Sequence, residues 1–168
     1  MGAGLLECTD MDFLSHLLWA YVLFHRQPWA ELGMVFCLLP DLFWAIPLIG
    51  LRIRHLRKKI PYVEENDIQT RALYRASHSL VTLAVAFLVS YFFFGVNAAS
   101  GIGAGWLLHI IMDVGTQKGG IVNGIRLFHP FSQWHIPAPI WWREQMRKRP
   151  WIYAVNLGLA AIVYYAFG

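Results

Sequence analysis

Five ionisable side chains lie inside otherwise apolar stretches of this sequence: His16, Asp41, His78, His109 and Asp113. Three imidazoles and two carboxylates suit a divalent metal, with zinc as the best match and manganese or iron as alternatives. His109 and Asp113 are four residues apart, so on a helix they share one face and can both reach one ion. These residue types at this spacing predict a metal site.

Each of these residues also has a simpler interpretation. His16 alone could be a hydrogen-bonding partner between helices. Asp41 follows a proline and could cap a half-helix, and His78 lies between two serines that could form a polar packing seam. His109 and Asp113 could form only a structural hydrogen bond. Five such groups in apolar surroundings are costly, however, so as a set they favour a metal site.

The stretches that carry these residues are long and uncharged. Hydrophobic residues make up 57% of the 168 residues, the mean hydropathy is +0.45, and only 14% of the residues are charged. A soluble domain carries about 25% charged residues. No Asp, Glu, Lys or Arg occurs from Ala76 to Met112. Because a bilayer core takes about 20 apolar residues per helix, the composition predicts an integral membrane protein. We expect a single domain over residues 1–168 and no nucleic-acid module.

The apolar runs predict an all-α fold, a polytopic membrane helical bundle of about five segments. The predicted segments are 12–25, 30–50, 72–96, 99–116 and 150–168. Pro40 and Pro47 are expected to bend or break the second segment, and a short turn near Asn97 is expected after the third. A basic polar loop is expected over 51–71 and a long loop over 117–149. Small residues in "SGIGAGW", at the start of the fourth segment, would let helices approach closely.

Lysine and arginine residues predict the orientation in the membrane. With the N-terminus in the cytoplasm, the loops 51–71 and 117–149 lie on the same side. All of the 14 Lys and Arg residues except Arg26 then lie in or beside cytoplasmic segments. This topology brings the five ionisable residues into the cytoplasmic half of the inner cell membrane. The net charge of +4 then reflects topology and attraction to anionic lipid.

Five short motifs give the chain a family resemblance. They follow one another in the order "SHLLWAYVLF", "LLPDLFW", "LYRASHSL", "GWLLHIIMDVGTQ" and "HPFS", over residues 12 to about 142. In this the chain resembles the membrane-bound metal-dependent hydrolase family, which includes inner-membrane hydrolases of the LexA-regulated type. The resemblance implies the same five residues as metal ligands. The family is distantly similar to the zinc-dependent phospholipase C and P1 nuclease group, which implies phosphoester hydrolysis at a lipid headgroup.

The chain departs from that family pattern at two places. Many members carry two histidines in the third motif, whereas "LYRASHS" contains only His78. Some members carry a histidine shortly after the fourth-motif aspartate, where this chain has Thr116 and Gln117. These departures weaken the expectation of a second metal.

The residues and the resemblance together predict a membrane-embedded hydrolase that cleaves a phosphoester of a lipid or lipid-linked substrate near the cytoplasmic face. Asp41 is the expected general base, and Arg75 either clamps a phosphate or snorkels to the interface. A metal or proton transporter or channel is the first alternative, although the outer halves of the spans lack the polar residues of such a pathway. The second alternative is a non-catalytic membrane protein whose His/Asp cluster only ties helices together. The sequence carries no signal for the oligomeric state.

Overall fold

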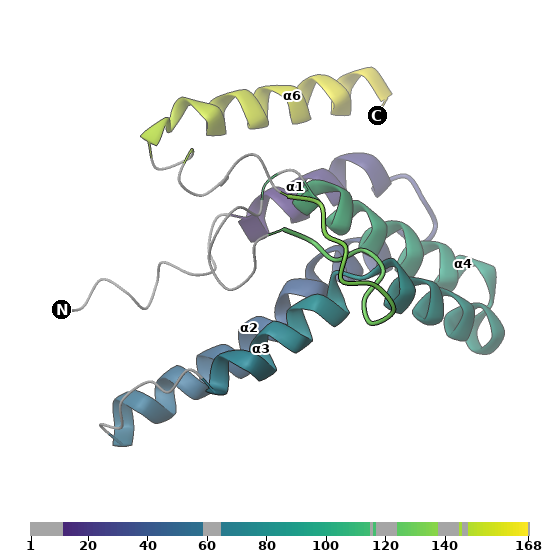
Figure 1. Ribbon diagram of the computed structural model, residues 1–168. Coiled ribbons are helices and arrows are strands. Elements are labelled where there is room, and N and C mark those ends of the chain that lie inside the picture. Colours follow the sequence, from purple (N-terminus) through teal and green to yellow (C-terminus); the bar gives the residue numbers. More distant parts are fainter. Residues whose placement is uncertain are drawn as a thin grey trace.

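The computed structural model describes residues 12–58, 65–114, 116, 124–137, 145 and 148–167. These residues form five α-helices and contain no β-strand. The helices are α1 (Asp12–Phe24), α2 (Ala30–Lys58), α3 (Glu65–Ser77), α4 (Leu80–Val114) and α6 (Trp151–Phe167). The all-helical class predicted from the sequence is therefore confirmed (Figure 1).

α2 is one continuous helix, although Pro40 and Pro47 lie inside it. The prolines therefore do not break the helix, while a bend at them stays a prediction. Each proline removes a backbone N–H from the helical ladder, but Pro40 is fully buried and α2 packs against α1, α3 and α4. This tertiary packing offsets the local cost, as it does for most helices in proteins. α2 also extends past the expected segment, and α3 follows it closely, so much of the expected loop 51–71 is helical.

α4 folds back on itself at Gly95, as Figure 1 shows. Gly95 has φ 82° and ψ 179°, a conformation that residues with a Cβ rarely adopt. The two halves then pack against each other, since a Cβ on Gly103 would lie 2.7 Å from a ring carbon of Phe87. This reversal is the turn predicted near Asn97. It brings the end of α4 back to the level of its start.

The second half of α4 packs on α2 with almost no space between the two backbones. A Cβ on Gly105 would lie 2.1 Å from the carbonyl oxygen of Gly33, and a Cβ on Gly101 would lie 2.8 Å from Leu32 Cβ. The small residues of "SGIGAGW" therefore permit the close approach that the sequence predicted.

α3 and α4 are separate helices, so the predicted continuous segment 72–96 is wrong. α3 ends at Ser77 and α4 begins at Leu80. Ser79 lies between them, and its hydroxyl accepts a hydrogen bond from the backbone N–H of Val81 at 3.1 Å. This is the N-cap role that serine favours, and it starts a new helix.

The segment 124–137 is fastened to this junction. The hydroxyl of Ser79 lies 3.1 Å from the carbonyl oxygen of Leu127 and 2.7 Å from that of His129. The backbone N–H of Leu80 also donates to the Leu127 carbonyl at 2.9 Å. A distant part of the chain is thus held beside the end of α3.

α6 packs on α1, in part through one polar residue. Asn156 accepts a hydrogen bond from Trp19 Nε1 at 2.8 Å, and its side-chain amide donates to the Ser15 hydroxyl at 3.3 Å. In Figure 1, α6 lies above α1, while the far part of α2 runs beside α3 toward the lower left.

The outer faces of these helices are strongly apolar. At the tip of the α4 hairpin, Phe92 and Phe93 are each 78% exposed and Phe94 is 73% exposed. Soluble monomers rarely expose continuous apolar surface of this kind. Two stretches, Ala30–Pro47 and Leu80–Val114, are long and apolar enough to cross a membrane. α1 and α6 are also apolar, but they are shorter than such a span. The chain is thus suited to membrane association, while the five-span bundle stays a prediction.

Candidate metal centre

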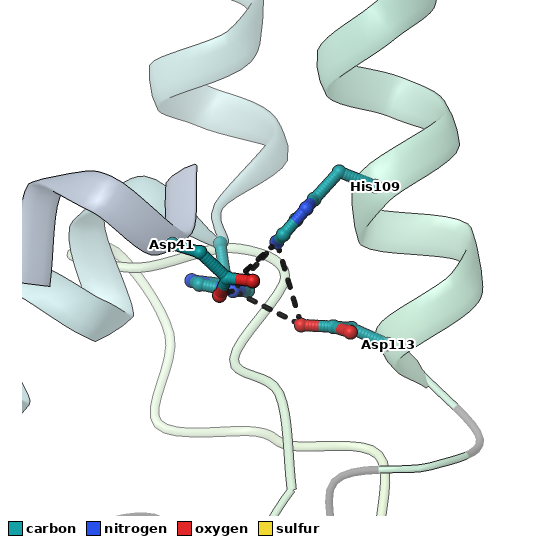
Figure 2. Close-up of side chains that lie close together, drawn as sticks. Asp41, His109 and Asp113 are labelled. Carbon is teal, nitrogen blue, oxygen red and sulfur yellow. Dashed lines mark hydrogen bonds and ion pairs between the residues drawn. The ribbon is translucent and has the colours of Figure 1, made fainter. Parts of the chain in front are cut away.

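Four of the five predicted site residues converge at one point. Asp41 comes from α2, His78 from the junction after α3, and His109 and Asp113 from the last turns of α4. Figure 2 shows the side chains of Asp41, His109 and Asp113 pointing toward one another. One potential ligand atom from each of the four residues lies within 4.8 Å of the others. The group could therefore hold a metal ion.

The ligand atoms are spaced as they would be around a small cation. His78 Nε2 lies 3.0 Å from His109 Nε2 and 3.1 Å from Asp113 Oδ2, and the latter two atoms are 3.4 Å apart. Asp41 Oδ1 lies 3.7 Å from each of the two Nε2 atoms. Zinc bonds of about 2.0–2.1 Å place tetrahedral ligand atoms roughly 3.3–3.4 Å apart. The five separations observed here range from 3.0 to 3.7 Å and so include this value.

The two imidazoles present lone pairs to this point. His109 Nδ1 lies 2.7 Å from the Cys37 carbonyl oxygen, and His78 Nδ1 lies 2.9 Å from the Tyr74 carbonyl oxygen. Because a carbonyl oxygen only accepts, each Nδ1 carries the proton, and Nε2 of a neutral ring is left as an acceptor. Two such Nε2 atoms then face two carboxylates in a buried place. The arrangement is unfavourable unless a cation lies among them, either a metal ion or protons on the imidazoles.

His16 reaches the same centre from α1, but through the other oxygen of Asp113. Its Nε2 lies 3.3 Å from Asp113 Oδ1, whereas Oδ2 faces His78 and His109. The rings of His16 and His109 stack with their centroids 4.2 Å apart. His16 therefore lies outside the four-residue group and is positioned to orient two of its members.

Asp41 is the most accessible member of the group. Its side chain is 14% exposed, whereas the side chains of His78, His109 and Asp113 are 0–1% exposed. Trp44 Nε1 donates to Asp41 Oδ1 at 3.2 Å, which fixes the orientation of this carboxylate. Because α2 is unbroken here, Asp41 does not cap a half-helix. A small molecule that approaches the centre meets Asp41 first.

Arg75, the expected phosphate clamp, lies in the last turn of α3 and outside the four-residue group. It precedes His78 by three residues. Its guanidinium lies near the positive side chains of Arg71 and Arg126. Arg75 therefore belongs to a neighbouring set of basic residues.

Sequence reasoning missed three residues that position the ligands. The ring of Tyr74 stacks on that of His78 with centroids 3.9 Å apart, and Trp44 holds Asp41. Both could have been found from spacing, because residues three or four apart share a helix face. Cys37 acts through its backbone carbonyl, which no side-chain pattern reveals.

No protein-family model, curated protein or solved structure matches this chain. The family resemblance drawn from the five motifs therefore stays a prediction.

Proposed function

We propose that this protein is an integral membrane, metal-dependent hydrolase that cleaves a phosphoester of a lipid or lipid-linked substrate near the cytoplasmic face. One observation carries the proposal: two imidazole Nε2 atoms and two carboxylates converge within 4.8 Å in a mostly buried place. Such a set needs a cation, and a divalent ion balances the charge of two carboxylates.

His78, His109 and Asp113 would hold the ion. Their ligand atoms are 3.0–3.4 Å apart, closer than the 3.7 Å between Asp41 and each histidine. A catalytic zinc site keeps three protein ligands and one open position, and this set matches that pattern. Manganese or iron would also accept it. A divalent ion here supplies Lewis-acid activation of water and of the phosphoryl group.

Asp41 would accept a proton from the attacking water. It combines a carboxylate beside the two histidines with an exposed edge, and the indole N–H of Trp44 fixes its direction. His78 and His109 keep Nε2 aimed inward because backbone carbonyls hold their Nδ1 atoms.

The arrangement of α4 supports a substrate carried by lipid. The exposed phenylalanines lie at the Gly95 end of the hairpin, and the four-residue group lies at the opposite end. If the hairpin crosses a bilayer, the group lies near one membrane face, and the Lys and Arg distribution assigns that face to the cytoplasm. An amphiphile could then present its phosphate to the site while its chains stay in the membrane.

Elemental analysis of the protein purified in detergent tests the metal. The wild type should carry about one equivalent of a transition metal, which His109→Ala and Asp113→Ala should lose. Ser90→Ala is the matched control, because this buried hydroxyl lies elsewhere in α4 and bonds only to the Ala86 carbonyl among the described residues. Wild-type protein that is free of metal and resists reconstitution would refute the proposal. Protonated histidines would then balance the carboxylates, and the cluster would only tie the helices together.

Turnover tests the substrate class. The metal-loaded protein in mixed micelles should hydrolyse phosphatidic acid or a polyprenyl phosphate, and His109→Ala should abolish this. Full activity on soluble phosphoesters with none on either lipid would overturn the lipid assignment.

A further inference from the structure

Four basic residues gather near the end of α3 that leads to His78. We call them the basic cluster: Arg71 and Arg75 from α3, and Arg126 and His129 from the segment 124–137. Burial, followed by the charges of Arg126 and Arg71, lowers the pKa of Arg75. Burial, followed by the charges of Arg75 and Arg126, lowers the pKa of His129. The three arginines are therefore close enough for their positive charges to repel one another, and they disfavour a proton on His129.

The fold holds these like charges together. The hydroxyl of Ser79 bonds the carbonyls of Leu127 and His129, as described above. The backbone N–H of Ile136 donates to the Ile125 carbonyl at 3.0 Å, closing the segment on itself. Arg126 is further held by a hydrogen bond from its guanidinium to Gln133. The repulsion is therefore built into the structure, which is expected where an anion is to be bound.

One donor in the basic cluster is buried with no acceptor from the part of the chain that the structure describes. Arg75 Nε has no hydrogen-bond partner among the described residues, although it is shielded from solvent. A buried donor in this state is costly, so it calls for an acceptor beyond the described residues, and a bound anion would supply one. The guanidinium group presents its N–H donors in a fork that matches phosphate oxygens.

The basic cluster and the metal centre are joined through the end of α3. Arg75 lies in the last turn of α3, and His78 follows Ser77, the last residue of that helix. Ser79, which anchors Leu127 and His129, follows His78 directly. A phosphate bound by Arg75 and Arg126 would therefore lie at the end of α3 that leads to His78.

We propose that Arg75 and Arg126, supported by Arg71 and His129, bind the phosphate group of the substrate. As a substrate site this rests on the proposed function, but phosphate binding itself does not. The chemical class is a phosphate monoester or diester, and a lipid headgroup and inorganic phosphate share the same recognition chemistry. Arg75 then has the role of a binding residue, and Arg126 ties the segment 124–137 to the substrate.

Calorimetric titration of the detergent-purified protein with inorganic phosphate tests the site, with metal-loaded and metal-free protein in parallel. Arg75→Gln and Arg126→Gln should each weaken phosphate binding about tenfold or more, because each removes a charged hydrogen-bonding group. Arg149→Gln is the matched control, since Arg149 is an exposed arginine just before α6. Arg75→Lys retains the charge without the fork, so it should fold like the wild type and bind phosphate with intermediate affinity.

Two results would overturn the site. The first is no phosphate binding by the wild type in either metal state. The second is equal weakening by Arg149→Gln, Arg75→Gln and Arg126→Gln, which would reduce the effect to general charge attraction. Elemental analysis separates this proposal from the preceding one. Metal-free wild type whose phosphate binding still depends on Arg75 refutes the hydrolase and retains the anion site.

Vesicles identify the source of the phosphate. Phosphatidylcholine vesicles with and without phosphatidic acid are titrated against the wild type, Arg75→Gln and Arg149→Gln. Tighter binding to phosphatidic acid that only Arg75→Gln loses supports a lipid headgroup. Binding of inorganic phosphate that depends on Arg75, with no preference for phosphatidic acid, supports the site with a free phosphate ligand.

Discussion

Adding one methyl group at Gly105 should disturb the metal centre from a distance. The Cβ of Gly105→Ala would lie 2.1 Å from the carbonyl oxygen of Gly33, whereas real Cβ atoms essentially never approach closer than 3.0 Å. The contact is to the α2 backbone, so no side chain can rotate away. α2 and α4 must therefore separate by about 0.9 Å.

This separation falls on the two helices that carry the centre. On α2, the Cys37 carbonyl oxygen lies 2.7 Å from Nδ1 of His109 on α4 and holds that ring in place. A shift of about 0.9 Å would break this hydrogen bond and release the His109 ring, so metal binding should weaken. We also expect overpacking to cost about 1–3 kcal/mol of stability.

Metal content and thermal unfolding in detergent measure the two effects. Gly105→Ala should lose most of its metal and unfold at a lower temperature than the wild type. Gly50→Ala is the control on α2, because nothing lies within 4 Å of its added Cβ and alanine favours the helix. A Gly105→Ala variant with wild-type metal content and unfolding temperature would refute the link between this contact and the centre.

Three further predictions concern single side chains. Asp113→Asn should abolish metal binding, whereas His16→Gln should retain the metal at reduced affinity because His16 only orients the Asp113 carboxylate. Elemental analysis after dialysis against a chelator measures both effects. Asp41→Asn should retain the metal but lower kcat about 10²–10⁴-fold in the lipid phosphoester assay. If this variant lost the metal, Asp41 would be a metal ligand and not the general base. Burial, followed by the charges of two arginines, lowers the pKa of His129 in the folded protein below the usual 6.5. The unfolded chain therefore binds more protons than the folded protein, and the free energy of unfolding should fall as the pH drops below 6.5. His129→Gln should flatten that slope in denaturation curves between pH 7.5 and 5.5, and an unchanged slope would contradict the assignment.

Long apolar runs made the helices predictable. The segment 12–25 corresponds to α1, 150–168 corresponds to α6, and the turn near Asn97 is the reversal at Gly95. These features depend on composition over many residues, so neighbouring sequence suffices to find them.

The errors lie where distant contacts override local preference. Pro40 reads as a helix breaker, but burial between packed helices keeps α2 continuous. The end of α3 reads as part of one long span, but Ser79 starts a new helix and bonds Leu127 and His129, which follow it by 48 and 50 residues. No local pattern contains that information.

For the site too, local sequence revealed some residues, whereas others depend on contacts between distant parts of the chain. The cost of placing ionisable groups among apolar residues was enough to select the residues that converge, including His78 and His109. Arg75 was recognised only as a lone arginine, because its neighbour Arg126 comes from a segment that the sequence does not place beside α3.

The hydrogen bond between His109 Nδ1 and the Cys37 carbonyl joins residues 72 positions apart. During synthesis, α1 and α2 are therefore complete long before the second half of α4 exists. The centre cannot assemble until the α4 hairpin has closed against α2, so loading of the proposed metal would be a late step in biogenesis. Nascent chains that end before His109 should then carry no metal, and loading would report that the α4 hairpin has closed.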